Sequence, residues 1–171
     1  MQLENPEYAA FRQRVPVVGV WDDHDYGRND GDKTYLYREQ SQQIFLDFLG
    51  EAVDSPRRRQ EGVYAAYTVG TGEQSVRIIL LDVRYNKDPY GATDGDFLGD
   101  AQWAWLEQEL RDSTAAFNLI VSGVQILPAD RFFGGENWQR FPQQRRRLLD
   151  LILTSNARGV LLMRYVPRLY T

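Results

Sequence analysis

Apolar residues recur along this chain in two spacings, and these spacings predict strands that alternate with helices. Short β-branched apolar runs bounded by glycine, proline or charged residues are typical of buried strands. We expect five such strands, at residues 15–21, 62–70, 75–84, 117–128 and from 158 onwards. The turn sequence "TGEQ" between the second and third runs predicts a hairpin or a close pair of strands.

Three other segments carry apolar residues near helical spacing. The first, at 34–50, ends at Gly50, a favourable C-terminal stop. The second is "GDAQWAWLEQELRDS", with Asp100 as its expected N-cap and with Trp103 and Trp105 expected in the core or at its edge. The third has Pro142 in its first turn. This alternation predicts an α/β domain whose sites collect beyond the C-terminal ends of its strands.

Length and composition narrow the choice of protein class. A chain of 171 residues with 43% apolar residues suits one domain with a sizeable core. A net charge of −4 offers no evident nucleic-acid-binding surface, so we expect the arginine runs at 57–59 and 145–147 to be solvated. The chain has no cysteine, which excludes disulfides and thiolate metal sites. We find no secretory signal or membrane-spanning segment, and the sequence leaves compartment and oligomeric state open.

The segment "WDDHDYGRNDGD" places five aspartates and the only histidine directly after the first expected strand. Converging carboxylates repel one another, and burial of an unpaired carboxylate costs on the order of several kcal/mol. A bound cation removes this conflict. Oxygen ligands favour Ca²⁺, Mg²⁺ or Mn²⁺, whereas one histidine does not indicate a typical zinc site.

This segment allows two other interpretations. An EF-hand calcium loop beginning at Asp25 would need glycine at its sixth position and glutamate at its twelfth, where this chain has Asp30 and Leu36. That interpretation is excluded. A polar turn that caps a helix starting near Thr34 stays possible, because Gly27, Asn29 and Gly31 are ordinary turn residues. The lone histidine is likewise either structural or a proton donor held near neutral pH.

Four segments in order resemble the alkaline phosphatase D (PhoD-like) family of metallophosphatases: "WDDHDYGRND", "LLDVRYNKDP", "LGDAQWAWLEQEL" and "NWQRFPQQRRRLLDLI". The resemblance covers most of the chain. It implies the central part of a two-sheet α/β/β/α sandwich and a metal-dependent phosphatase or phosphodiesterase that acts on phosphate esters. It also implies divalent or trivalent ions, with Ca²⁺ and Fe³⁺ suggested and Mn²⁺ or Mg²⁺ as further candidates, which would polarise the phosphoryl oxygen.

The resemblance also implies roles for particular residues. Asp23 falls where the wider superfamily has a metal-binding amide, and Asn29 matches a second ligand. Asp22 is a third candidate ligand or a group that orients its neighbours. His24 is implied to protonate the leaving alkoxide or to stabilise phosphate, and Arg84 to grip a phosphate oxygen.

Other features argue against a complete site. On charge pairing alone, Arg84 could instead pair with Asp82 or Asp94. Gln125 stands where many metallophosphatases use a histidine. The family's acidic "GD" segment ahead of the hallmark and its "SGDxH" segment after the last strand are missing, so we expect a single partial domain over 1–171 with weak or no activity and marginal stability. A non-catalytic folded remnant or interaction module is the alternative function.

Overall fold

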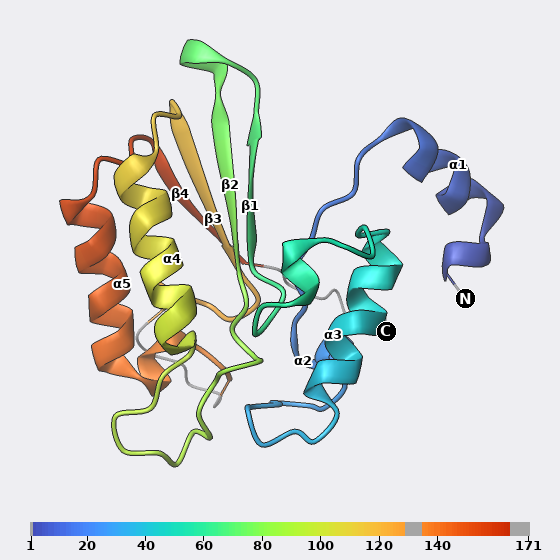
Figure 1. Cartoon of the computed structure of the whole chain (residues 1–171). Coiled ribbons are helices and arrows are strands. Elements are labelled where there is room, and N and C mark those ends of the chain that lie inside the picture. The colour runs from blue at the N-terminus through green and yellow to red at the C-terminus, as the bar shows by residue number, and fades with distance from the viewer. Residues whose placement is uncertain (1, 129–134, 165–171) are drawn as a thin grey trace.

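The computed structural model describes residues 2–128 and 135–164 and contains a four-stranded sheet with helices beside it (Figure 1). The strand order is β1-β2-β3-β4. The strands are β1 (Ala65–Val69), β2 (Val76–Leu81), β3 (Phe117–Ser122) and β4 (Val160–Arg164). β1 is antiparallel to β2, whereas β2, β3 and β4 run parallel. The predicted α/β class is therefore confirmed.

The hairpin between β1 and β2 is also confirmed, with Val69 opposite Val76 across the turn. β2 ends at Leu81, earlier than predicted, because Asp82 turns the chain. The Asp82 carboxylate accepts hydrogen bonds from the backbone N–H groups of Val63, Arg84 and Tyr85. β3 ends early for a similar reason, since the Ser122 hydroxyl bonds to the backbone of Val124.

The helices α4 (Gly99–Asp112) and α5 (Pro142–Thr154) cover one face of the sheet (Figure 1). Trp103, Leu106 and Leu110 of α4 and Leu148 of α5 join the main core there. Asp100 is not the N-cap of α4. The Asp96 carboxylate takes that part by accepting hydrogen bonds from the backbone N–H groups of Leu98 and Gly99.

The first predicted strand, at 15–21, is wrong. This segment forms no strand in the part of the chain that the structure describes, and Val18 is 40% exposed. An apolar run needs a neighbouring strand to complete its hydrogen bonds, and here a side chain takes that place: Arg57 donates to the carbonyl of Gly19 at 2.7 Å. Trp21 at the end of the segment is nevertheless fully buried.

The remaining helices lie before and after this segment. They are α1 (Pro6–Arg14), α2 (Asp23–Tyr26), α3 (Arg38–Leu49) and the 3-10 helices η1 (Gln2–Glu4), η2 (Pro56–Arg58), η3 (Gly72–Gln74) and η4 (Trp138–Arg140). α3 ends at Gly50, which adopts the left-handed φ of 74°, as predicted. α3 begins later than predicted because Thr34 sits in a turn and hydrogen-bonds to Asp32.

The expectation that the arginine runs are solvated is confirmed for Arg59, Arg146 and Arg147, which are exposed, and is wrong for the other three. Arg57 is 6% exposed and donates to the carbonyl of Val63, while Arg58 pairs with Asp47. Arg145 donates to the carbonyls of Ile126 and Leu127. Backbone carbonyls that lack strand or helix partners attract these guanidinium groups.

A membrane span requires a helix of sufficient length and hydropathy. None of the helices within the described ranges meets both requirements.

Candidate functional site

The aspartate-rich segment forms the short helix α2 directly after Trp21. Gly27 follows the helix with a φ of 111°, a left-handed conformation that favours glycine. The Asp23 carboxylate accepts hydrogen bonds from the backbone N–H groups of His24 and Asp30, at 2.8 and 3.2 Å. Part of the turn chemistry expected for this segment is therefore present, and it fixes the direction of Asp23.

Arg84 lies at the centre of the site, just beyond the end of β2. It is fully buried, and its Nε donates to Asp22 at 3.0 Å while its Nη1 donates to Glu136 at 2.7 Å. Its Nη2 contacts both carboxylates. Burial alone would lower the pKa of Arg84, but the hydrogen bonds to Glu136 and the charge of Asp22 raise it. The ion pairs of Arg84 are thus with Asp22 and Glu136, in place of Asp82 or Asp94.

Glu136 completes an acidic group with two aspartates. One carboxylate oxygen each from Asp23, Asp30 and Glu136 lies within 4.8 Å of the others. Asp30 reaches this position with a left-handed φ of 52°. Burial and then the nearby Glu136 raise the pKa of Asp30, whereas Arg84 holds the pKa of Glu136 low against the effect of burial. The group therefore concentrates negative charge that is only partly compensated.

Tyr90 and Lys87 pack behind Glu136. The Tyr90 hydroxyl donates to Glu136 at 2.6 Å, and the Lys87 Nζ lies 3.8 Å from the centroid of the Tyr90 ring. Lys87 is fully buried, and its Nζ has no hydrogen-bond partner among the described residues. Burial lowers the pKa of Lys87, although the charge of Glu136 opposes this shift. The site thus combines two buried cations with the acidic group.

The structure places the predicted site residues in different settings. Asp23 lies in the acidic group, whereas Asp22 is held by Arg84. The His24 side chain is 83% exposed, and its Nε2 is 4.0 Å from Asp23. Asn29 is exposed on the turn after α2. The structure therefore brings together Asp22, Asp23 and Arg84 and leaves the other two facing solvent.

Asp22 is close to the end of β3 as well as to Arg84. A side chain at Gly123, which follows β3, would put its Cβ 2.9 Å from the Asp22 carboxylate. Only glycine leaves room for this approach. The carboxyl ends of β2 and β3 therefore meet the acidic segment at one place, as expected for a parallel sheet.

Sequence reasoning missed Asp30, Glu136 and Lys87. Glu136 follows a glycine-rich stretch that carries no ligand pattern, and it lies 52 residues beyond Arg84. Asp30 was visible as part of the aspartate run, which is the one signal that could have identified it. Gln125, at the expected histidine position, has a buried side-chain Oε1 without a partner among the described residues.

Comparisons with known proteins identify the family of this chain. Alkaline phosphatase D of Bacillus subtilis (strain 168) is 24% identical over 186 residues, which cover 91% of this chain and 31% of that protein. The chain thus spans about a third of the length of this curated relative. No solved structure matches the chain. A family model described as PhoD-like phosphatase matches residues 1–163. The chain therefore belongs to the PhoD-like phosphatase family.

Proposed function

We propose that this chain carries part of a metal-dependent phosphoric ester hydrolase site of the phosphatase or phosphodiesterase type. The observation that carries the proposal is the convergence of Asp23, Asp30 and Glu136, whose carboxylate oxygens lie within 4.8 Å of one another. Family membership supports the same reaction class. The substrate would be a phosphate monoester or diester.

The side chains of the acidic group suit a hard cation. All three donors are carboxylate oxygens, which Ca²⁺, Mg²⁺ and Mn²⁺ prefer, and Fe³⁺ is a further candidate. Burial, and after it the charge of Glu136, raises the pKa of Asp30, so a bound cation would favour its charged form. Asp23, Asp30 and Glu136 would hold the ion, with Asp22 and Asn29 as further candidate ligands. A bound ion would polarise the phosphoryl oxygen and lower the pKa of a bound water.

Arg84 is not free to bind a phosphate oxygen as the resemblance implied. Its guanidinium donors already engage Asp22 and Glu136. We therefore assign Arg84 to orienting these two carboxylates, and it would grip a phosphate oxygen only by exchanging one of them for substrate. This arrangement keeps Glu136 directed into the acidic group.

His24 remains the candidate proton donor. Its side chain is exposed beside Asp23, so it can approach the leaving oxygen of an ester bound at the acidic group. Because the His24 side chain has no buried partner within the described ranges, its replacement should not disturb the fold. If His24 donates the proton, the replacement should lower turnover.

The proposal includes the fold that surrounds the site. We propose that residues 1–171 form a single partial domain, the central part of a two-sheet sandwich. A mainly apolar cavity of about 860 Å³ lies between the face of the sheet away from α4 and α5 and the segments 17–22 and 44–49. Ile78, Leu80 and Val121 line its sheet side. An apolar face of this kind is what a second layer of structure would cover.

Metal binding and hydrolysis, measured side by side, test this proposal. The wild-type chain is titrated with Ca²⁺, Mn²⁺ and Fe³⁺ by calorimetry and assayed with aryl phosphate mono- and diesters. We expect Glu136→Gln to weaken metal binding by about 10- to 100-fold, and Glu107→Gln on the surface of α4 to leave it unchanged. His24→Ala should lower turnover while metal affinity stays the same.

Three outcomes separate the alternatives. No binding of any of these ions would reject the metal site. Equal affinities for wild type and Glu136→Gln would move the site away from the acidic group. Tight metal binding without turnover in the wild type would favour the non-catalytic remnant for this chain.

A further inference from the structure

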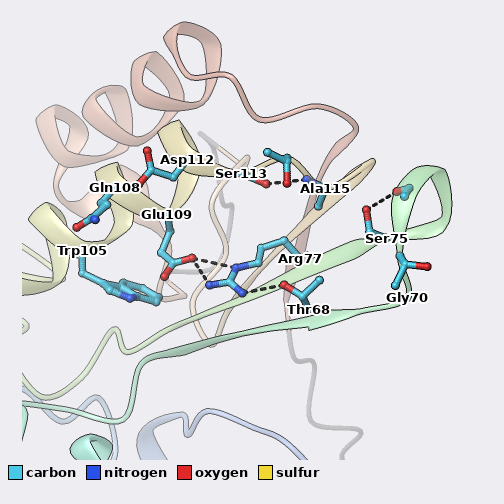
Figure 2. Close-up of a pocket in the computed structure, with 13 residues that line it drawn as sticks. Thr68, Gly70, Ser75, Arg77, Trp105, Gln108, Glu109, Asp112, Ser113 and Ala115 are labelled. Carbon is cyan, nitrogen blue, oxygen red and sulfur yellow. Dashed lines mark hydrogen bonds and ion pairs between the residues drawn. The ribbon is translucent and has the colours of Figure 1, made fainter.

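A second cavity lies at the opposite end of the sheet from the acidic group. It has a volume of about 820 Å³ and lies between the β1–β2 hairpin and the C-terminal half of α4 (Figure 2). Ser75, before the start of β2, lines it, whereas Arg84 follows the other end of that strand. A cavity of this size suits a small organic ligand. A ligand here would not compete with one at the acidic group.

The charges around this cavity disfavour an anion. Arg77 is the only cation among the described residues that line the cavity. Its Nε donates to Glu109 at 2.9 Å, and its Nη1 donates to Thr68 at 2.8 Å (Figure 2). Asp112 adds a second negative charge to the lining. The guanidinium is therefore already neutralised, and a phosphate or carboxylate would meet unpaired negative charge. Asp112 would attract a cationic ligand, so a cation is the competing occupant, with tetramethylammonium as its separate probe.

Trp105 gives the cavity a flat apolar surface. Its ring packs against Tyr64 at a centroid distance of 4.7 Å, which holds it in place, and Figure 2 shows it beside Glu109 at the cavity. No other aromatic residue lines the cavity within the described ranges. The aliphatic face of a sugar ring presents C–H groups that pack well on such a surface.

Hydrogen-bonding groups also line the cavity. Gln108 and Asp112, on the same helix, are exposed and make no side-chain hydrogen bond among the described residues. Thr71 and Thr114 add hydroxyls from the two loops that border the cavity. An amide, a carboxylate and hydroxyls together can both donate to and accept from a ligand that carries several hydroxyl groups.

We propose that this cavity binds a neutral saccharide, stacked on Trp105 and hydrogen-bonded to Gln108 and Asp112. The combination of one flat ring, uncharged or acidic acceptors and a neutralised arginine fits a ligand that is hydroxyl-rich and uncharged. The proposal does not depend on the hydrolase activity, because the two sites use different residues and opposite ends of β2.

Amide-resolved NMR titration of the wild-type chain tests the proposal. The probes are glucose, N-acetylglucosamine and maltose, with inorganic phosphate and tetramethylammonium in separate titrations. We expect at least one saccharide to shift amides within 68–77 and 105–115. Gln108→Ala, which changes an exposed side chain, should weaken that binding by about threefold or more, and Trp105→Ala by at least about tenfold. Glu107→Gln, on the same helix but outside the cavity lining, should bind like the wild type.

The outcomes decide the proposal whether or not the chain hydrolyses esters. It is overturned if no saccharide shifts these amides, or if Gln108→Ala and Trp105→Ala both bind as tightly as the wild type. Binding of phosphate or tetramethylammonium at these amides, without saccharide binding, would also overturn it. Because Trp105→Ala removes packing on Tyr64, its amide spectrum is first compared with that of the wild type. Gln108→Ala supplies the result if that variant is unfolded.

Discussion

Arg84 joins three parts of the chain that are far apart in sequence. Its partners are Asp22, 62 residues earlier, and Glu136, 52 residues later, and all three meet beyond the strand ends. A guanidinium with no exposed surface has no water to replace these bonds. The two carboxylates therefore depend on Arg84 for their charge balance, and loss of Arg84 would leave both unpaired.

Replacement of this one side chain should destabilise the whole chain. We expect Arg84→Met to lower the free energy of unfolding by about 3–5 kcal/mol, because two partly buried carboxylates lose their cation. Arg84→Lys should recover part of this loss, since an ammonium keeps the charge but cannot form the same paired hydrogen bonds. Arg146→Met, at an exposed position of α5, serves as the control and should change stability by less than about 0.5 kcal/mol. Urea denaturation measures all three, and equal midpoints for Arg84→Met and Arg146→Met would contradict the prediction.

The same residues show what sequence can and cannot predict at this scale. The aspartate run and its position after an apolar segment pointed to the region where Asp23 lies, because that signal is local. The pairing of Arg84 with Glu136 carries no local signal, since it arises only when two loops meet at the strand ends. Burial of Lys87 depends likewise on Tyr90 packing over it. Sequence therefore indicated part of the acidic site and missed the residues that complete it.

At the scale of elements, prediction succeeded where the signal lies within one segment. The periodicity of α4 and α5, the glycine after α3 and the "TGEQ" turn are each complete in a short stretch. The strand predicted at 15–21 is wrong because a strand needs a hydrogen-bonded neighbour. The composition of the segment does not reveal that the Arg57 side chain bonds to its backbone instead. The prediction of Asp100 as the N-cap of α4 is wrong for a related reason, because the Asp96 carboxylate reaches the first N–H groups of the helix from the preceding loop.

That loop is itself held by an ion pair that should respond to pH. Asp88 accepts a hydrogen bond from the Asp96 backbone at 3.0 Å and pairs with Lys33 at 2.6 Å, which ties the loop to the turn after α2. Burial would raise the pKa of Asp88, but Lys33 and the Asp96 N–H outweigh it and hold the pKa below its ordinary value. A lowered folded-state pKa stabilises the fold above the unfolded pKa of about 3.9, and this contribution is lost as pH falls through the folded value.

Asp88→Asn should therefore be less stable than the wild type at pH 7, by less than about 1 kcal/mol because Lys33 is half exposed. The difference should shrink as the pH falls below about 4. Lys33→Met, which removes the partner, should lose part of this pH dependence, because the Asp96 N–H still bonds to the carboxylate. Urea denaturation between pH 7 and pH 3 measures these differences. A difference in the free energy of unfolding between wild type and Asp88→Asn that stays constant over this range would contradict a lowered pKa of Asp88 in the folded chain.

At the scale of the whole molecule, the two faces of the sheet differ. One face, which includes Ile79, Leu81 and Ile120, packs under α4 and α5 in the main core. The strand register puts Leu80, Val121 and Met163 on the opposite face, where Leu80 is buried but Met163, at the β4 end of the sheet, is 50% exposed. The alternation of strands and helices predicted the α/β class. It could not predict strand order or which part of the sheet is left exposed, because both depend on contacts between elements.

Neighbouring residues of β4 allow this difference to be measured with one substitution type. Leu162 packs against the main core, whereas Leu161 points to the other face and is 56% exposed. We expect Leu162→Ala to lower the free energy of unfolding by about 1–3 kcal/mol, because it removes packed methyl groups, and Leu161→Ala by less than about 0.5 kcal/mol. Chemical denaturation of both variants and the wild type gives the comparison. Equal losses would mean that the Leu161 face is covered in solution, either by residues outside the described ranges or by another copy of the chain. In that case the open face would no longer support a partial domain, and the proposal would need a different structural basis.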